Sequence, residues 1–168
     1  RESLITGDEL KAGDRLIGVS SNGIHSNGFS LARKLISVDS PFRKEMLKPT
    51  HIYTKPVVRL FSEYPGAVKG LAHITGGGWT NITRPKEALG YEISNHLPVP
   101  EIFQELARSI SLPEMYKTFN MGIGLCVMTE AKNVEHIISI FSACDFNAAE
   151  IGEITDRGPS LIIKNAPG

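Results

Sequence analysis

The chain has 168 residues, and its 18 basic and 18 acidic side chains give a formal net charge of zero at neutral pH. A chain of this length fits one domain that buries about 70% of the surface of the unfolded chain. The balanced charge, without a basic or acidic block, argues against nucleic acid or an anionic membrane as the main partner.

Cysteine usage and hydropathy indicate a cytoplasmic protein. Cys126 and Cys144 stand apart in apolar surroundings without metal-ligand spacing, which favours reduced core residues, with a disulfide between them as the alternative. We expect no signal peptide, and no apolar run approaches the length that crosses a membrane. Because residue 1 is Arg rather than Met, we also expect a piece of a longer chain.

The first quarter of the chain predicts a strand, a loop and a helix. Residues 1–13 are polar and rich in turn formers, and an apolar run over 15–19 predicts the first strand. After the loop at 20–28, the periodicity over 29–38 predicts a helix that packs on a sheet. Its expected buried face comprises Leu31, Leu35 and Val38.

The loop at 20–28 is the stretch around which the rest is organised. Gly23 and Gly28 allow tight turns and a close approach to a ligand, and Ser26 and Asn27 are residue types that cap helices. Backbone N–H groups at a helix start favour an anion. A phosphate or carboxylate site and an ordinary capped helix start fit equally well, because the loop is neither GxGxxG nor a Walker A motif.

A second glycine-rich loop follows the next helix and strand. Residues 41–52 predict a loop, and Thr54 can cap a helix that buries Val57, Leu60, Phe61 and Tyr64. The apolar run over 68–74 predicts a strand, which ends in Thr75, Gly76, Gly77 and Gly78. A loose linker is one interpretation, but we favour a second place where the backbone approaches a ligand.

The remaining chain alternates irregularly between strands and helices. We expect strands at 89–94 and 122–129, the second apolar on both faces, and helices at 101–110, 112–119 and around 134–141. The runs over 150–154 and 161–163, separated by a turn signal at 156–159, predict a terminal hairpin. The fold class is therefore α/β (α+β), with a mixed β-sheet of about six strands and helices packed on it.

Four segments together resemble a known family. They are Gly13–Leu31, the run Lys48-Pro49-Thr50-His51-Ile52-Tyr53, the run Ala72–Gly78, and Glu114–Gly124. In this order they resemble the aminoimidazole ribonucleotide (AIR) synthetases, also called phosphoribosylformylglycinamidine cyclo-ligases. The match covers only the C-terminal half of such an enzyme and implies its mixed-sheet fold.

The resemblance implies the following organisation and reaction. Residues 1–12 would be the interdomain connection and 13–168 the C-terminal domain, while an N-terminal domain that binds ATP and Mg²⁺ is absent from this sequence. The reaction would convert formylglycinamidine ribonucleotide to 5-aminoimidazole ribonucleotide in purine biosynthesis, with release of ADP and phosphate. The implied partners are that substrate and the N-terminal domain, in an enzyme that forms a homodimer.

Combined with the resemblance, the residues predict a substrate and phosphate site. His25 is the candidate catalytic residue, as a general base or a charge partner for phosphate, although it could equally brace the loop. Asn120 could bond the substrate or act as a turn residue, and His73 is expected to be a satisfied structural histidine. No metal ligand is predicted in this chain. The candidate binding residues are Ser21, Asn22, Gly23, Ser26, Asn27, Gly28, Thr75, Gly76, Gly77, Gly78 and Asn120.

Two other classes of function remain as alternatives. The chain could be a stand-alone module that binds a phosphorylated metabolite, or a structural domain with vestigial loops. It could also be the C-terminal domain of another ATP-dependent phosphotransferase or synthetase of the same superfamily.

Overall fold

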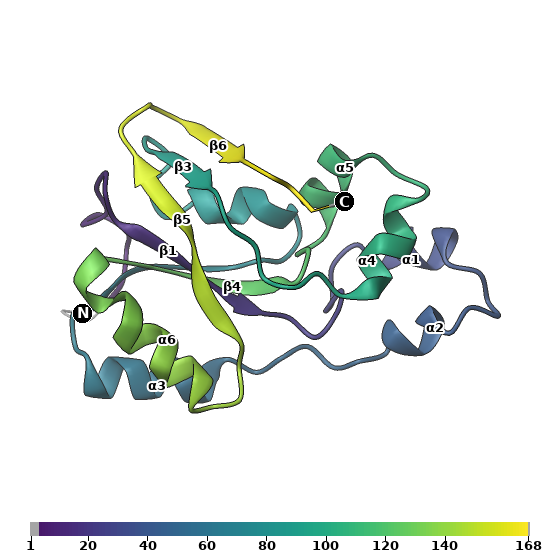
Figure 1. Ribbon diagram of the computed structural model, residues 1–168, viewed down its shortest axis with the longest axis horizontal. Helices are drawn as coiled ribbons and strands as arrows, with labels where there is room; N and C mark the ends of the chain where they lie inside the picture. The colour runs from purple at the N-terminus through teal and green to yellow at the C-terminus, as the bar shows by residue number, and fades with distance from the viewer. Residues whose placement is uncertain (1–3, 168) are drawn as a thin grey trace.

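A single six-stranded sheet forms the centre of the computed structural model, which describes residues 4–167 (Figure 1). Its strand order is β2-β4-β1-β5-β3-β6. The strands are β1 (Arg15–Ser20), β2 (Val68–His73), β3 (Gly90–Ile93), β4 (Ile123–Thr129), β5 (Ala148–Thr155) and β6 (Ser160–Ile163). All neighbours are antiparallel except β3 and β6, so the sheet is mixed and the predicted fold class is confirmed.

Strands β1 and β4 lie side by side in the interior of the sheet, as the apolar runs over 15–19 and 122–129 predict. Every residue of β4 is buried, because both faces of this strand are covered. Gly18 of β1 pairs with Cys126 of β4, and a Cβ at Gly18 would lie 2.9 Å from the Ile151 side chain of β5. The absence of a side chain at this position lets Ile123 and Ile151, which belong to one apolar cluster, pack over the strand.

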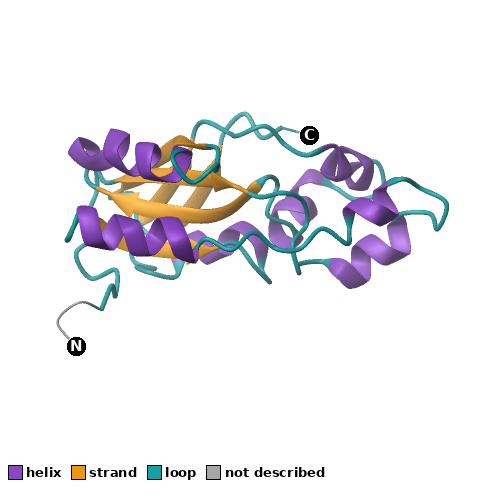
Figure 2. Cartoon of the chain, turned by 90° about the horizontal axis from the view of Figure 1, so that it is seen from below, coloured by secondary structure: helices purple, strands orange, loops and turns teal. Residues whose placement is uncertain are grey.

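Helices cover the two faces of the sheet and form two apolar clusters. On one face α3 (Thr54–Glu63) contacts α6 (Val134–Ser142), and both pack on residues such as Ile17 and Val127. The other cluster joins the opposite face to η1 (Gly78–Thr83), α1 (Phe29–Leu35), α4 (Glu101–Ala107) and α5 (Leu112–Thr118). Two short helices, α2 (Phe42–Glu45) and η2 (Ala131–Asn133), complete the set. Of these helices, α1, α4 and α5 lie together with α2 beyond one end of the sheet, whereas η1 contacts β2, β3 and β6 (Figure 1 and Figure 2).

Buried charges join the strand ends opposite to the glycine loops. Lys69 of β2 lies 2.9 Å from Asp14 and 3.1 Å from Glu130, and the Lys69 and Asp14 side chains are buried. The pKa of Glu130 is lowered to about 2 by its hydrogen bonds to Lys132 and Lys69. The network ties the starts of β1 and β2 to the end of β4.

The structure corrects several predictions about strand pairing, helix ends and buried residues. The terminal hairpin does not form, because β3 lies between β5 and β6 and pairs with both. The first helix ends at Leu35 rather than residue 38, and Val38 is exposed. Phe61 of α3 is also exposed, and part of the expected loop at 41–52 is helix α2.

The two cysteines are free, as expected, but only Cys126 is a core residue, since Cys144 is half-buried. Burial raises the pKa of the Cys126 thiol to about 12. No helix within residues 4–167 combines the length and apolar character needed to cross a membrane.

Candidate functional site

Asn120 joins three of the sequence motifs at one point. Its side chain is fully buried, and its Oδ1 accepts hydrogen bonds from Ser21 Oγ at 2.8 Å and from the Gly122 N–H at 2.9 Å. Its Nδ2 donates to the Gly23 carbonyl at 2.9 Å. The Asn120 carbonyl accepts from Trp79 Nε1 at 3.0 Å, directly after the second glycine loop. Asn120 therefore holds both loops in place through hydrogen bonds to Ser21, Gly23 and Trp79. Its bond to the Gly122 N–H is the local turn contact, which was one of the two predicted roles.

The first loop, residues 20–28, does not present the capped helix start that its Ser and Asn residues predict. Gly28 is the cap residue of α1, in a left-handed conformation (φ 62°), and no side chain caps the helix. The Asn27 side chain instead donates to the Ile74 carbonyl at 3.0 Å, which ties this loop to the end of β2. A Cβ at Gly28 would lie 2.3 Å from the Phe119 ring, so glycine is required here for close packing as well as for its φ.

The segment 48–51 closes the outer side of the first loop. Asn22 Nδ2 donates to the Pro49 carbonyl at 2.9 Å, and Ser26 Oγ lies 3.2 Å from Thr50 Oγ1. Between loop and segment lies a cavity of about 400 Å³. It is lined by His25, Ser26, Phe29, Met46, Leu47, Lys48, Pro49 and Thr50.

His25 is the most unusual residue of the loop. Only 4% of its surface is exposed, its φ is 54°, and neither ring nitrogen has a hydrogen-bond partner among residues 4–167. The bond to a backbone carbonyl that would brace the loop is therefore absent from the described part of the chain. Burial, with smaller contributions from His51 and His73, lowers the pKa of His25 to about 4.

Three aromatic side chains, two from the segment directly before α3 and one from β2, surround His25. The ring centroids of His51, Tyr53 and His73 lie 5.9, 6.3 and 6.5 Å from that of His25. Tyr53 OH donates to the Ser20 carbonyl at 2.8 Å, which anchors the start of α3 to the end of β1. The His73 side chain is exposed and makes no hydrogen bond within residues 4–167, so the expectation of a satisfied structural histidine is wrong.

Gly124 of β4 makes room for this cluster. A Cβ at this position would lie 2.1 Å from Tyr53 Oη and 2.6 Å from His25 Cε1. Sequence reasoning missed the cluster because its members lie far apart in the chain. The available signal was strand alternation, which places His73 on the same face of β2 as Leu71.

The second loop, residues 75–78, is held by one side chain. Asn81 is buried, and its Nδ2 lies 3.2, 3.2 and 2.7 Å from the carbonyl oxygens of Thr75, Gly76 and Gly78. The N–H groups of Gly76 and Gly77 have no acceptor among the described residues. The carbonyls of the loop thus turn towards Asn81, and two N–H groups stay available for an anion or water.

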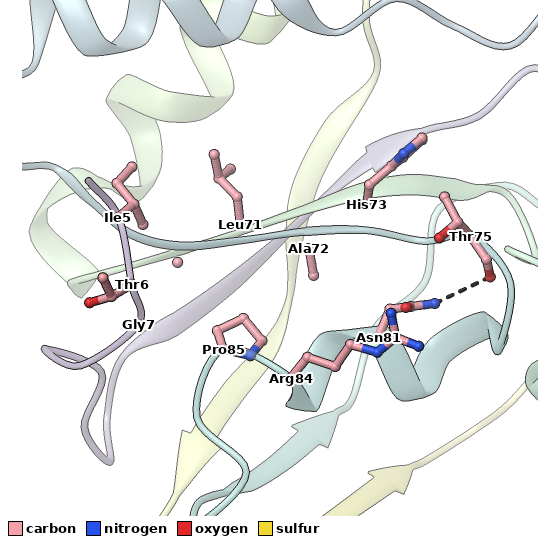
Figure 3. Close-up of a pocket in the computed structure, with 11 residues that line it drawn as sticks. Ile5, Thr6, Gly7, Leu71, Ala72, His73, Thr75, Asn81, Arg84 and Pro85 are labelled. Atoms are coloured by element: carbon pink, nitrogen blue, oxygen red, sulfur yellow. Dashed lines mark hydrogen bonds between the residues drawn. The ribbon is translucent and has the colours of Figure 1, made fainter. Parts of the chain in front are cut away.

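A cavity of about 440 Å³ lies beside the second loop (Figure 3). Figure 3 shows Asn81 and Arg84 on one side of β2, with the His73 ring projecting from the other side. Arg84 makes no ion pair within residues 4–167, and its Nη2 would lie 3.6 Å from a Cβ at Gly77. The exposed face of this loop therefore carries a positive charge together with free N–H groups.

The structure thus brings the predicted site residues together at one end of the sheet. Asn120 links the loops through Ser21, Gly23 and Trp79, and Asn27 links them through Ile74. Trp79 is buried and packs against Tyr116, so its ring belongs to the core beside the second loop. Across residues 4–167, no group of three or more His, Cys, Asp or Glu side chains is placed to hold a metal ion.

The sequence matches a family model over residues 11–164, which is nearly the whole chain. The model describes AIR synthase related proteins, C-terminal domain. The chain belongs to this family. Its six-stranded mixed sheet, with both glycine loops at one end, is thus the C-terminal domain of an AIR synthase related protein.

Curated relatives of this AIR synthase related domain are phosphoribosylformylglycinamidine cyclo-ligases. The protein of that name from Methanobrevibacter smithii is 44% identical over 92% of this chain and 49% of its own length. The one from Clostridium perfringens is 41% identical over 98% of this chain and 52% of its own length. The chain therefore spans about half the length of the curated relatives it matches.

Solved structures confirm the fold at low sequence identity. The hydrogenase maturation protein HypE of Escherichia coli superposes with a TM-score of 0.67 and 22% identity, over 96% of this chain and 50% of that protein. Phosphoribosylformylglycinamidine synthase II of Thermotoga maritima gives 0.63 and 17%, over 99% of this chain and 26% of that protein. These likenesses show a shared fold.

Proposed function

We propose that this domain is the C-terminal half of an ATP-dependent phosphoribosylformylglycinamidine cyclo-ligase. The longer enzyme would convert formylglycinamidine ribonucleotide to 5-aminoimidazole ribonucleotide, and residues 1–12 would connect the two halves. The observation that carries the proposal is the identity of 44% over 92% of the chain to a cyclo-ligase. Further support comes from Asn120, which brings the glycine loops of this domain to one place.

The role of this half in the reaction is to bind and orient the substrate. Ring closure requires that a nitrogen and a carbon of one flexible molecule meet, and holding them in contact can lower the barrier by several kcal/mol. The available N–H groups of Gly76 and Gly77, beside the Arg84 guanidinium, suit a phosphate group. We assign the substrate site to the two loops and Asn120, where Asn120 acts by holding the loops in place.

ATP and Mg²⁺ belong mainly to the N-terminal half in this proposal. Bound ATP would turn the formyl oxygen of the substrate into a phosphate leaving group. The described residues of this chain contain no set of ligands arranged for a metal ion, so we route no step through Mg²⁺ here. The interface with the N-terminal half, and homodimer formation, are part of the same proposal.

A chimera tests the proposal. In the Methanobrevibacter smithii cyclo-ligase, this chain would replace the C-terminal half, to which it is 44% identical. We expect aminoimidazole product from the chimera with ATP, Mg²⁺ and formylglycinamidine ribonucleotide, and none from this chain alone. A chimera that folds and binds ATP but gives no product would contradict the proposed activity, and turnover by this chain alone would contradict the division between two halves.

A further inference from the structure

Two unfavourable features and one close packing contact coincide at His25, and their coincidence indicates a function. A non-glycine residue in the left-handed region costs roughly 1–2 kcal/mol. A buried polar side chain without a partner costs roughly 1–3 kcal/mol more, and both ring nitrogens are in that state within the described chain. The ring is also held above Gly124, where any larger residue would displace it. Native proteins retain such features where a ligand completes them.

The cavity that His25 lines is not built for an anion. Lys48 is the one cationic side chain among its lining residues, and its Nζ lies 2.5 Å from Glu45 Oε2. The other polar lining groups are the hydroxyls of Ser26 and Thr50, which are neutral. A free phosphate would therefore find little positive potential here, in contrast to the second loop, where Arg84 has no ion pair within residues 4–167.

We propose that His25 binds the uncharged formamide end of the substrate through a neutral imidazole, while phosphate is bound elsewhere on the glycine loops. This inference rests on the proposed function and names the part of the substrate that this cavity takes. A neutral imidazole offers one donor and one acceptor, which complement the N–H and C=O of a formamide group. The titratable groups that face the ring are His51, Tyr53 and His73, and none of them is a carboxylate that would favour its protonation.

Nuclear magnetic resonance of the histidine rings of this chain tests the inference. Formylglycinamidine ribonucleotide and ribose 5-phosphate are the two probes, because both carry the phosphate and only the first carries the formamide. We expect the first probe to shift the His25 ring nitrogens and the loop amides, and the second to shift loop amides alone. In the absence of probe, the His25 ring should keep the spectrum of a neutral tautomer from pH 8 to pH 5.

The affinities of two His25 variants for the same two probes provide a second, matched test. His25→Phe keeps the ring volume and removes both hydrogen-bonding groups, whereas His25→Gln keeps a donor and an acceptor. Affinity for formylglycinamidine ribonucleotide should fall about tenfold in His25→Phe and less than threefold in His25→Gln. Affinity for ribose 5-phosphate should change less than twofold in both.

The possible outcomes separate this inference from the proposed function. Equal losses for both probes, or a His25 ring that titrates near pH 6.5 and binds phosphate more tightly on acidification, would overturn the inference. Loop amides that respond to both probes with a silent His25 ring would overturn it too, while leaving the proposed function intact. If neither the loop amides nor the His25 ring shifts with either probe, the result would instead count against the proposed function. If His25→Phe does not fold, the ring spectra of the parent chain and the affinities of His25→Gln test the inference.

Discussion

The two glycine loops have similar sequence signatures but are stabilised in opposite ways. The first is largely buried and is tied to distant parts of the chain, by the Asn120 side chain and by the bond of its own Asn27 to the Ile74 carbonyl. The second is largely exposed at Gly76 and Gly77 and is held by Asn81, a residue of its own neighbourhood. A glycine-rich stretch after a strand can thus be a packed support for one functional side chain, or an open surface of backbone N–H groups.

The largest expected effect comes from the glycines of the second loop, which differ sharply among themselves. A Cβ at Gly78 would lie 2.2 Å from the Tyr116 carbonyl oxygen, at a φ of 56°, whereas a Cβ at Gly76 would meet nothing within 4 Å. The clash is with backbone, so α5 must shift to relieve it. We expect Gly78→Ala to lower the free energy of unfolding by about 3 kcal/mol or more, from overpacking and left-handed strain.

Gly76→Ala is the matched control within the same four residues. It should change the free energy of unfolding by less than about 0.5 kcal/mol, as for an ordinary surface substitution. Urea denaturation of both variants measures the difference. Equal destabilisation by the two substitutions would contradict the close contact of Gly78 with the Tyr116 carbonyl and the open space at Gly76.

A pH titration distinguishes the loops by the one buried titratable group that the first contains. The pKa of His25 is about 4 in the folded chain, against an ordinary value near 6.5, so folding favours the neutral ring. Its contribution to stability is therefore complete above pH 6.5 and is lost as the pH falls towards 4. Relative to His25→Gln, the parent should lose about 2 kcal/mol of unfolding free energy over this interval.

Urea denaturation at a series of pH values, with both proteins in the same buffers, provides the measurement. The comparison removes the pH dependence that both proteins share through their carboxylates. Parallel profiles for parent and variant would show that the buried ring titrates as it does in the unfolded chain.

The sequence predicted the scaffold well because its signals are local. The apolar run at 122–129 gave the central strand within one residue, and the periodicity around 134–141 gave α6. The terminal hairpin failed because pairing depends on a third segment: β3 inserts between β5 and β6, and nothing in the turn at 156–159 reports that. Strand order is a long-range property, whereas turn chemistry is local.

The site was predictable in its members but not in their roles. The motifs placed the loops and Asn120 together only through a resemblance, and the network around Asn120 depends on contacts between residues 97 and 99 positions apart. His25 stood out in sequence, but its unpartnered nitrogens and its low pKa arise from burial beneath residues that come much later in the chain. The capped helix start, one of the two interpretations of the first loop, is wrong because no side chain caps α1 and Asn27 forms a tertiary bond instead.

The smallest expected effect concerns those two residues, which look interchangeable in sequence and are not in the structure. Ser26 is exposed, and its hydroxyl contacts only Thr50, at 3.2 Å on the surface, so Ser26→Ala should change the free energy of unfolding by less than about 0.5 kcal/mol. Asn27 is buried, and Asn27→Ala would leave the Ile74 carbonyl without its donor, at a cost of about 1–2 kcal/mol.

If Ser26 and Asn27 were instead helix caps, each substitution would lower the free energy of unfolding by about 1 kcal/mol and would affect α1 alone. Hydrogen exchange separates the two accounts, because loss of the tertiary bond should speed exchange at the ends of both loops, while loss of a cap would speed it only in the first turn of α1. Equal effects of the two substitutions, confined to α1, would support the capped helix start and would contradict the link between the loops through Asn27 and Ile74.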